Sequence, residues 1–290
     1  MGLHHKNFIG LVAAVGWLGM VSAASAGDPP EWSAPVRPFQ IAHGIYYVGT
    51  QGLAAYLIVS SQGAILLDAT TAGNAALVER NIETVGVGLR DVKLLLSDHA
   101  HSDHVGALAK IKQDTGAKVL ASAGDRWALE HGQIRSDTDY TPTGFPPVKV
   151  DRLVRDGETI RLGDVALTAH LTPGHTAGCT SWSMMVDEGG ARRQVLFLCS
   201  LTVAGNILAG NHAYPQIATD YRKTFDKLAA MKADILLTSH PGFANVLGRE
   251  ARRERGETNA FIDPTALPSL VAASKRSFER ELDAAKKAHP

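Results

Sequence analysis

The chain has 290 residues, with 29 lysines and arginines against 29 aspartates and glutamates, and 45% of its residues are hydrophobic. This composition is that of a folded globular protein and excludes a disordered, collagen-like or coiled-coil chain. The balanced charge leaves no basic excess for binding phosphate backbones, so we expect no nucleic-acid partner.

The first 26 residues carry the pattern of an export signal. A short polar and basic start precedes the apolar run from Phe8 to Val21, and Ala24-Ser25-Ala26 then offers small residues for cleavage. An uncleaved membrane anchor is the alternative, but the run is shorter than the roughly 20 residues that a spanning helix needs. We therefore expect cleavage after Ala26, a periplasmic location without membrane attachment, and a single domain over residues 27–290.

Strand and helix patterns alternate along the first half of the chain. The predicted strands cover residues 45–48, 54–59, 64–67, 92–96 and 118–121. The predicted helices cover residues 74–85, 104–115 and 125–131. Periodicity then disappears over residues 132–147, and a loop of this length in a compact domain indicates a functional segment.

The second half repeats the mixture of strands and helices. Its predicted strands cover residues 148–154, 159–162, 165–171, 181–186, 195–198 and 235–238. Its predicted helices cover residues 221–231 and 268–288. Two halves of this kind predict an α/β fold, a four-layer αββα sandwich.

Side chains that bind metals are concentrated directly after the predicted strand 92–96. The turn there reads His99-Ala100-His101-Ser102-Asp103-His104, and it holds three of the 12 histidines of the chain. Imidazole and carboxylate are ligands for zinc or iron, and alternate residues of an extended turn project to the same side. Two metal ions could therefore share this turn.

Two later histidines occupy matching positions after predicted strands. His175 follows the strand 165–171 and His240 follows the strand 235–238, each next to glycine or proline. Loops at one rim of a sandwich commonly deliver functional residues in this way. The cluster and these two histidines divide into two sets of three ligands, and each set leaves room for a water molecule on a zinc ion.

The His-x-His-x-Asp-His motif, the Thr-Pro-Gly-His-Thr segment and the late Ser-His-Pro-Gly segment resemble the metallo-β-lactamase superfamily. Within it, the chain resembles the third subclass of class B β-lactamases over most of residues 30–250. The resemblance implies the fold predicted above and two zinc ions per chain. It implies that one zinc is held by His99, His101 and His175, and the other by Asp103, His104 and His240.

The resemblance also implies an activity: opening of the amide bond of penicillins, cephalosporins and carbapenems by a metal-bound hydroxide. Asp103 is the expected catalytic residue, because it would orient the hydroxide as well as bind the second zinc. The hydroxyls of Ser200 and Thr202 are expected to bind the substrate carboxylate; alternatively, they only satisfy backbone groups at a strand end. We expect a monomer whose partner is the small-molecule substrate.

Glyoxalase II-like thioesterases and lactonases of the same superfamily are the main alternative. They share these ligands and add a bridging aspartate on the strand between the two late histidines, whereas residues 195–202 contain no carboxylate. That absence favours the β-lactamase interpretation. The chain also lacks the Ser-x-x-Lys, Gly-x-Ser-x-Gly and His-Glu-x-x-His motifs of other hydrolases. A binding or sensor protein that keeps the metal site without turnover is the alternative from another class.

Two departures from the resembling pattern concern the turn Asp68-Ala69-Thr70 and the cysteines. The turn has no glycine where one is usual, and no cysteine follows Cys199 to form the disulfide of the C-terminal third that many members have. For Cys179 and Cys199 we favour small buried residues without a bond, ahead of a local disulfide or a displaced metal ligand.

Overall fold

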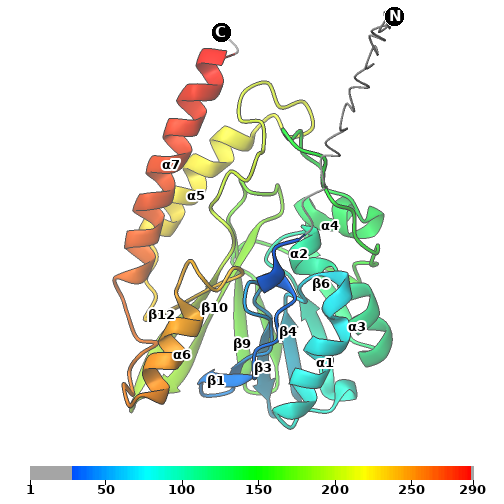
Figure 1. Cartoon of the computed structure of the whole chain (residues 1–290), viewed down its shortest axis with the longest axis vertical. Coiled ribbons are helices and arrows are strands. Elements are labelled where there is room, and N and C mark those ends of the chain that lie inside the picture. Colours follow the sequence, from blue (N-terminus) through cyan, green and yellow to red (C-terminus); the bar gives the residue numbers. More distant parts are fainter. Residues whose placement is uncertain (1–27, 289–290) are drawn as a thin grey trace, which may run out of the picture.

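Two β-sheets lie face to face between two outer layers of helices in the computed structural model (Figure 1). The structure describes residues 28–288, so the predicted export signal in residues 1–26 lies outside the described residues. Within residues 28–288 the strand orders are β1-β2-β3-β4-β5-β6-β7 and β12-β11-β10-β9-β8. The predicted four-layer αββα sandwich is confirmed.

The first sheet and its helices come from the first half of the chain. Its strands are β1 (Phe39–Ala42), β2 (Ile45–Tyr47), β3 (Tyr56–Ser60), β4 (Gly63–Leu67), β5 (Val92–Leu96), β6 (Lys118–Ser122) and β7 (Arg152–Val154). The helices of this half are α1 (Ala75–Thr84), α2 (Ser102–Val105), α3 (Leu108–Thr115) and α4 (Ala123–His131). Short 3₁₀ turns span Pro30–Trp32, Ala72–Asn74 and Leu89–Asp91.

The second sheet carries the remaining helices. Its strands are β8 (Thr159–Leu162), β9 (Val165–Leu171), β10 (Thr180–Glu188), β11 (Ala191–Leu198) and β12 (Ile235–Thr238). The helices are α5 (Ile217–Ala229), α6 (Val246–Glu254) and α7 (Ala266–Ala288). No helix within residues 28–288 combines the length and the apolar character that crossing a membrane requires.

Large aromatic side chains fill the space between the sheets and the space under the outer helices. Trp182 and Tyr56 are fully buried between the sheets, and the Tyr56 ring meets the Phe197 ring edge-on at 5.2 Å. On the outer side, Tyr221 of α5 packs against Phe278 of α7 at 4.8 Å. Burying each such side chain contributes about 1.5–3 kcal/mol, so these contacts fix how the helices sit on the sheet.

The predicted helix over residues 104–115 is wrong in its continuity, because the chain forms α2 and α3 with a break at Gly106 and Ala107. A Cβ atom at Gly106 would lie 2.5 Å from the backbone nitrogen of Ala72, so the chain passes too close to the Ala72–Asn74 turn for a larger residue. This break sets α2 apart as a separate turn that carries Asp103 and His104. The strand predicted over 148–154 shrinks to β7, and β1 and α6 were not predicted.

The favoured interpretation of the two cysteines is also wrong. Cys179, just before β10, and Cys199, just after β11, form a disulfide. β10 and β11 are antiparallel neighbours, so the start of one strand and the end of the other lie side by side. The bond therefore joins the loop that carries His175 to the segment that carries Ser200 and Thr202.

Replacing both cysteines by alanine should lower the free energy of unfolding by about 3 kcal/mol, because the bond closes a loop of 20 residues in the unfolded chain. Urea unfolding of metal-depleted protein measures this difference. A reducing agent should bring the unmodified protein to the same stability and leave the double variant unchanged. Equal stability of the oxidised protein and the double variant would contradict the prediction.

Candidate metal centre

The ends of four strands bring the predicted site residues to one rim of the sandwich. β9 and β11 both run antiparallel to β10, and β12 runs parallel to β11, so these three strands end on the same side. His175 follows β9, Thr202 follows β11 and His240 follows β12. The turn from His99 to His104 follows β5 of the other sheet and completes the rim.

The structure brings the six predicted ligands together in two groups. In each group the potential ligand atoms all lie within 4.8 Å of one another. The first triad consists of His99, His101 and His175. The second triad consists of Asp103, His104 and His240.

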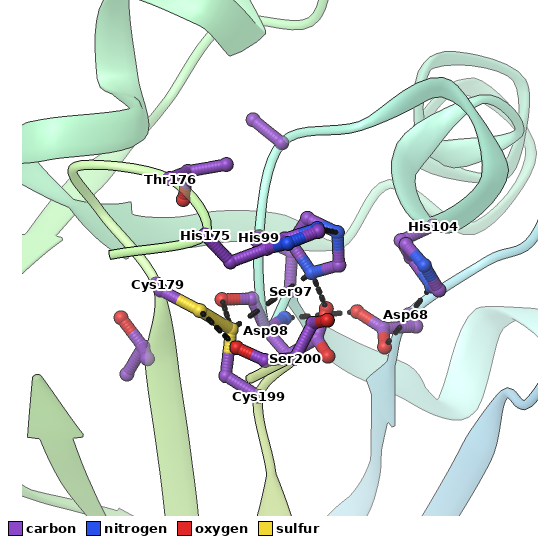
Figure 2. Close-up of polar contacts among 12 residues, drawn as sticks. Asp68, Ser97, Asp98, His99, His104, His175, Thr176, Cys179, Cys199 and Ser200 are labelled. Atoms are coloured by element: carbon purple, nitrogen blue, oxygen red, sulfur yellow. Dashed lines mark hydrogen bonds and ion pairs between the residues drawn. A yellow bond between two sulfur atoms is a disulfide. The ribbon is translucent and has the colours of Figure 1, made fainter. Parts of the chain in front are cut away.

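Two histidines of the first triad are oriented by acceptors on their Nδ1 atoms. His99 Nδ1 lies 2.8 Å from Asp98 Oδ1, and His175 Nδ1 lies 2.7 Å from the carbonyl oxygen of Thr202. Each Nδ1 therefore donates its proton, and the two Nε2 atoms, which face one another at 3.1 Å, both present lone pairs (Figure 2). A cation between them would remove the repulsion of these lone pairs, so the first triad fits a metal ion.

The first triad also has the protonation state that metal binding requires. Burial lowers the pKa of His99, His101 and His175 to about 3, so their rings are neutral at pH 7. Burial alone would raise the pKa of Asp98, but the neighbouring His99 and His104 hold it below its usual range. A neutral imidazole that donates to a carboxylate is the arrangement found behind many zinc-bound histidines.

The second triad pairs a carboxylate with two imidazoles. Asp103 Oδ2 lies 3.1 Å from His104 Nε2 and 3.2 Å from His240 Nε2. Burial would lower the pKa of His104, but Asp103, Asp98 and Asp68 raise it to about 10. Neither ring nitrogen of the buried His104 makes a well-directed hydrogen bond within residues 28–288. A cation would replace the imidazolium charge and satisfy the ring, so this triad also fits a metal ion.

Three buried carboxylates for which the sequence predicts no role hold the turn that carries the ligands. Asp98 orients His99, and the backbone N–H of Asp98 donates to Asp68 Oδ1 at 2.9 Å. Asp125 accepts hydrogen bonds from the N–H of Ala100 at 3.0 Å, the hydroxyl of Thr176 at 3.1 Å and the N–H of Gly178 at 3.1 Å. Only the position of Asp98 beside His99 offered a signal in the sequence.

Asp125 links the two loops of the first triad because the backbone passes unusually close there. A Cβ atom at Gly124 would lie 2.3 Å from the carbonyl oxygen of Ala177, and one at Gly178 would lie 2.2 Å from the backbone nitrogen of Asp125. The start of α4 therefore packs directly against the loop that carries His175. Larger residues at either glycine would push the loop away from the turn of His99.

The metal cleft is a cavity of about 320 Å³ that residues of both triads line. Trp32 and Tyr140 form part of its wall, so the N-terminal segment and the loop over residues 132–147 both border it. Thr202 lines this cleft, whereas Ser200 is 8% exposed and lines a small pocket with Thr238. The two hydroxyls lie 3.0 Å apart, and of the two residues predicted to bind the substrate carboxylate only Thr202 lines the metal cleft.

Comparison with known proteins identifies relatives over most of the chain. The family model described as "Metallo-beta-lactamase superfamily" matches residues 50–240 of the chain. The subclass B3 metallo-beta-lactamase BJP-1 of Bradyrhizobium japonicum is 43% identical, with a TM-score of 0.86 over 90% of this chain and 99% of that one. FEZ-1 of Legionella gormanii is 36% identical, with a TM-score of 0.84 over 88% of this chain and 98% of that one.

Curated relatives are similar over shorter segments. A hydroxyacylglutathione hydrolase of Bradyrhizobium sp. is 30% identical over 43% of this chain and 41% of its own length. The uncharacterised YobT of Bacillus subtilis is 34% identical over 44% of this chain and 54% of its own length. The chain thus spans about half the length, or less, of these relatives.

Replacing Asp125 by alanine should lower the free energy of unfolding of metal-depleted protein by about 2–4 kcal/mol, because two buried backbone N–H groups and a hydroxyl lose their acceptor. We also expect the affinity for zinc to fall about tenfold, since the two ligand loops are no longer tied together. Urea unfolding and competition with a chromophoric chelator measure the two effects.

The control for Asp125 is Asp187→Ala, at a carboxylate whose side chain is 86% exposed. This change should shift stability by less than about 0.5 kcal/mol and leave zinc affinity unchanged. Equal behaviour of the two variants would show that Asp125 does not hold the site together.

Proposed function

The chain belongs to the metallo-beta-lactamase superfamily, and from this we propose that it is an exported dizinc hydrolase that opens the amide bond of β-lactam antibiotics. The observation that carries the proposal is the similarity to subclass B3 metallo-beta-lactamases over nine-tenths of the chain. The two triads on one cleft support it, because each offers three protein ligands and leaves room for a further ligand.

In this proposal the first triad holds one zinc ion and the second triad holds the other. Bound zinc lowers the pKa of water to about 7 and polarises a carbonyl group, which is the chemistry that amide hydrolysis needs. Asp98 keeps the proton of His99 on Nδ1, so that Nε2 stays available as a ligand. His175 is held in the same way by the carbonyl oxygen of Thr202.

Asp103 acts on the attacking water in this proposal. Its Oδ2 is held between His104 and His240 on the wall of the metal cleft, where it can accept a hydrogen bond from water and direct the oxygen towards the lactam carbonyl. The hydroxyl of Thr202, which also lines the metal cleft, binds the substrate carboxylate. Ser200 takes part through water or by orienting that hydroxyl, which lies 3.0 Å away.

A thioester or lactone hydrolase is the second candidate function, and the similarity to hydroxyacylglutathione hydrolases favours it. The end of β11 argues against it. The residue there is Cys199. Its sulfur lies 3.8 Å from His99 Nδ1 and is bonded to the sulfur of Cys179. The disulfide thus lies on the Nδ1 side of His99, behind the ring that presents Nε2 to the first triad, and residues 195–202 offer no carboxylate as a bridging ligand.

Export to the periplasm rests on the pattern of the first 26 residues alone. N-terminal sequencing of protein purified from the periplasm tests it. A new N-terminus at residue 27 is the expected result, and an intact first segment in the cytoplasmic fraction would refute it.

Chelation should lower the turnover of a chromogenic cephalosporin at least about a thousandfold, and added zinc should restore it. The reason is that no side chain can replace the metal ions in the proposed mechanism. Elemental analysis must show that the metal has left, and circular dichroism must show that the fold remains. Turnover that survives verified removal of metal would exclude the proposed mechanism.

Replacing Asp103 by asparagine should lower kcat about a hundredfold or more and reduce the number of bound zinc ions from two to one, because a ligand and the acceptor for water are lost together. Stopped-flow kinetics and elemental analysis check both effects. Asp187→Asn, an exposed change elsewhere, should alter neither. A variant with two zinc ions and a nearly normal kcat would show that Asp103 has no such role.

Zinc-loaded protein should open cephalosporins and carbapenems while leaving glutathione thioesters and acyl-homoserine lactones nearly untouched. A bridging carboxylate would add negative charge to both metal ions, and residues 195–202 supply none. The comparison of kcat/KM for one substrate of each class decides between the two candidate functions. Similar values for a thioester and a cephalosporin would show that the substrate class is wrong.

A further inference from the structure

Three segments from distant parts of the chain line the metal cleft together. They are the loop over residues 132–147, the loop after β9 and the segment after β11. In that order they contribute Ile134, Tyr140, Pro142 and Thr143; His175; and Thr202 and Ala204. How a substrate sits over the first triad therefore depends on how these three segments are held against one another.

One buried side chain, Asn206, makes hydrogen bonds to all three segments. Its Nδ2 donates to the carbonyl oxygen of His175 at 3.2 Å and to that of Val203 at 2.8 Å. Its Oδ1 accepts the hydroxyl of Ser136, in the loop over residues 132–147, at 2.5 Å. Asn206 is the one side chain within residues 28–288 that forms hydrogen bonds to both Ser136 and His175.

Ser136 connects Asn206 to a second buried asparagine, Asn211. The hydroxyl that donates to Asn206 accepts a hydrogen bond from Asn211 Nδ2 at 3.1 Å. Asn211 is itself fixed, because its Oδ1 accepts the backbone N–H of Tyr214 at 2.7 Å. We call Ser136, Asn206 and Asn211 the Asn206 cluster.

A short stretch of backbone pairing lies beside the Asn206 cluster. The N–H of Asp139 donates to the carbonyl oxygen of Gly205 at 2.9 Å, and the N–H of Ile207 donates to that of Asp137 at 2.9 Å. This pairing is an isolated bridge outside the strands of both sheets. Short pairings of this kind open locally at a low cost in free energy, so the side chains of the cluster decide how firmly it stays closed.

The loop that carries His175 is held in place by other contacts as well. His175 Nδ1 donates to the carbonyl oxygen of Thr202, and Asp125 accepts two hydrogen bonds from residues that follow His175. The disulfide joins the end of this loop to the end of β11. Loss of the bond from Asn206 therefore leaves His175 in position, whereas the loop over residues 132–147 loses its link to the first triad.

We propose that Asn206 is a positioning residue, which fixes the loop over residues 132–147 against the first triad so that the wall of the metal cleft fits the substrate. This inference rests on the proposed function and makes it more specific. Asn206 is buried outside the metal cleft and acts through the wall. Tyr140 and Thr143 are the parts of that wall whose position depends on it.

The first test separates substrate binding from turnover. For Asn206→Ala, KM for benzylpenicillin and for a carbapenem should rise about tenfold, while kcat stays within about threefold and two zinc ions remain bound. The reason is that contacts with the wall contribute similarly in the ground state and in the transition state. Asn259→Ala, at an exposed asparagine, is the matched control and should change none of these values.

Variants of Ser136 test the same link from the side of the loop. Ser136→Ala should raise KM in the same direction, and adding it to Asn206→Ala should cause little further change, because both act through one hydrogen bond. Ser136→Thr keeps the hydroxyl and should keep KM near that of the unmodified protein. If Asn206→Ala does not fold, the comparison of Ser136→Ala with Ser136→Thr carries the test.

Amide hydrogen exchange, followed by NMR on zinc-loaded protein, measures the loop without any substrate. Asn206→Ala should accelerate exchange of the Asp139 and Ile207 amides at least about tenfold. The Gly178 amide, which donates to Asp125, should exchange at an unchanged rate. Unmodified protein that opens no lactam contradicts the proposed function, and KM for a glutathione thioester is then measured in place of the lactams.

Each remaining outcome counts against the inference. Unchanged exchange at Asp139 and Ile207 would show that Asn206 does not hold the loop. Faster exchange with an unchanged KM would show that the position of the loop does not matter for the substrate. A fall in kcat together with loss of zinc would show that Asn206 supports the metal site instead.

Discussion

Buried imidazole rings can bind a metal only while they remain neutral and correctly turned, and the rest of this structure depends on that constraint. Burial keeps His99, His101 and His175 uncharged at neutral pH. Acceptors on Nδ1 then decide which nitrogen faces the partner ring, as Asp98 does for His99. Without these acceptors the buried imidazole rings would lack hydrogen bonds, which would lower the stability of the fold, and nothing would hold them in one orientation.

The sandwich meets this constraint through contacts between segments that are far apart in the sequence. Asp125 at the start of α4 joins the turn after β5 to the loop after β9, and the glycines at 124 and 178 allow the backbone segments to come within contact. The disulfide between Cys179 and Cys199 joins that loop in turn to the end of β11. Hydrogen bonds to Asp125 and the disulfide therefore tie together the loops that carry ligands from both sheets.

Substrate class depends on the residues around the ligands more than on the ligands themselves. In the proposed function, the features that separate a β-lactam hydrolase from a thioester hydrolase are the lack of a carboxylate in residues 195–202 and the wall of the metal cleft. Trp32 and Tyr140 form part of that wall. Both lie outside the strands and α-helices, where substitutions leave the core intact.

The sequence by itself determined the fold class and most elements, because apolar periodicity and short turns report burial locally. The strand over residues 92–96 is found at its predicted position, and the six predicted ligands come together because each follows a strand. Only the tertiary structure decided the break at Gly106, the disulfide, and the roles of Asp68 and Asp125. Each of these depends on a contact between segments that folding alone brings together, such as Gly106 against Ala72 or Asp125 against Ala100. Patterns among residues that are neighbours in the sequence do not predict such contacts.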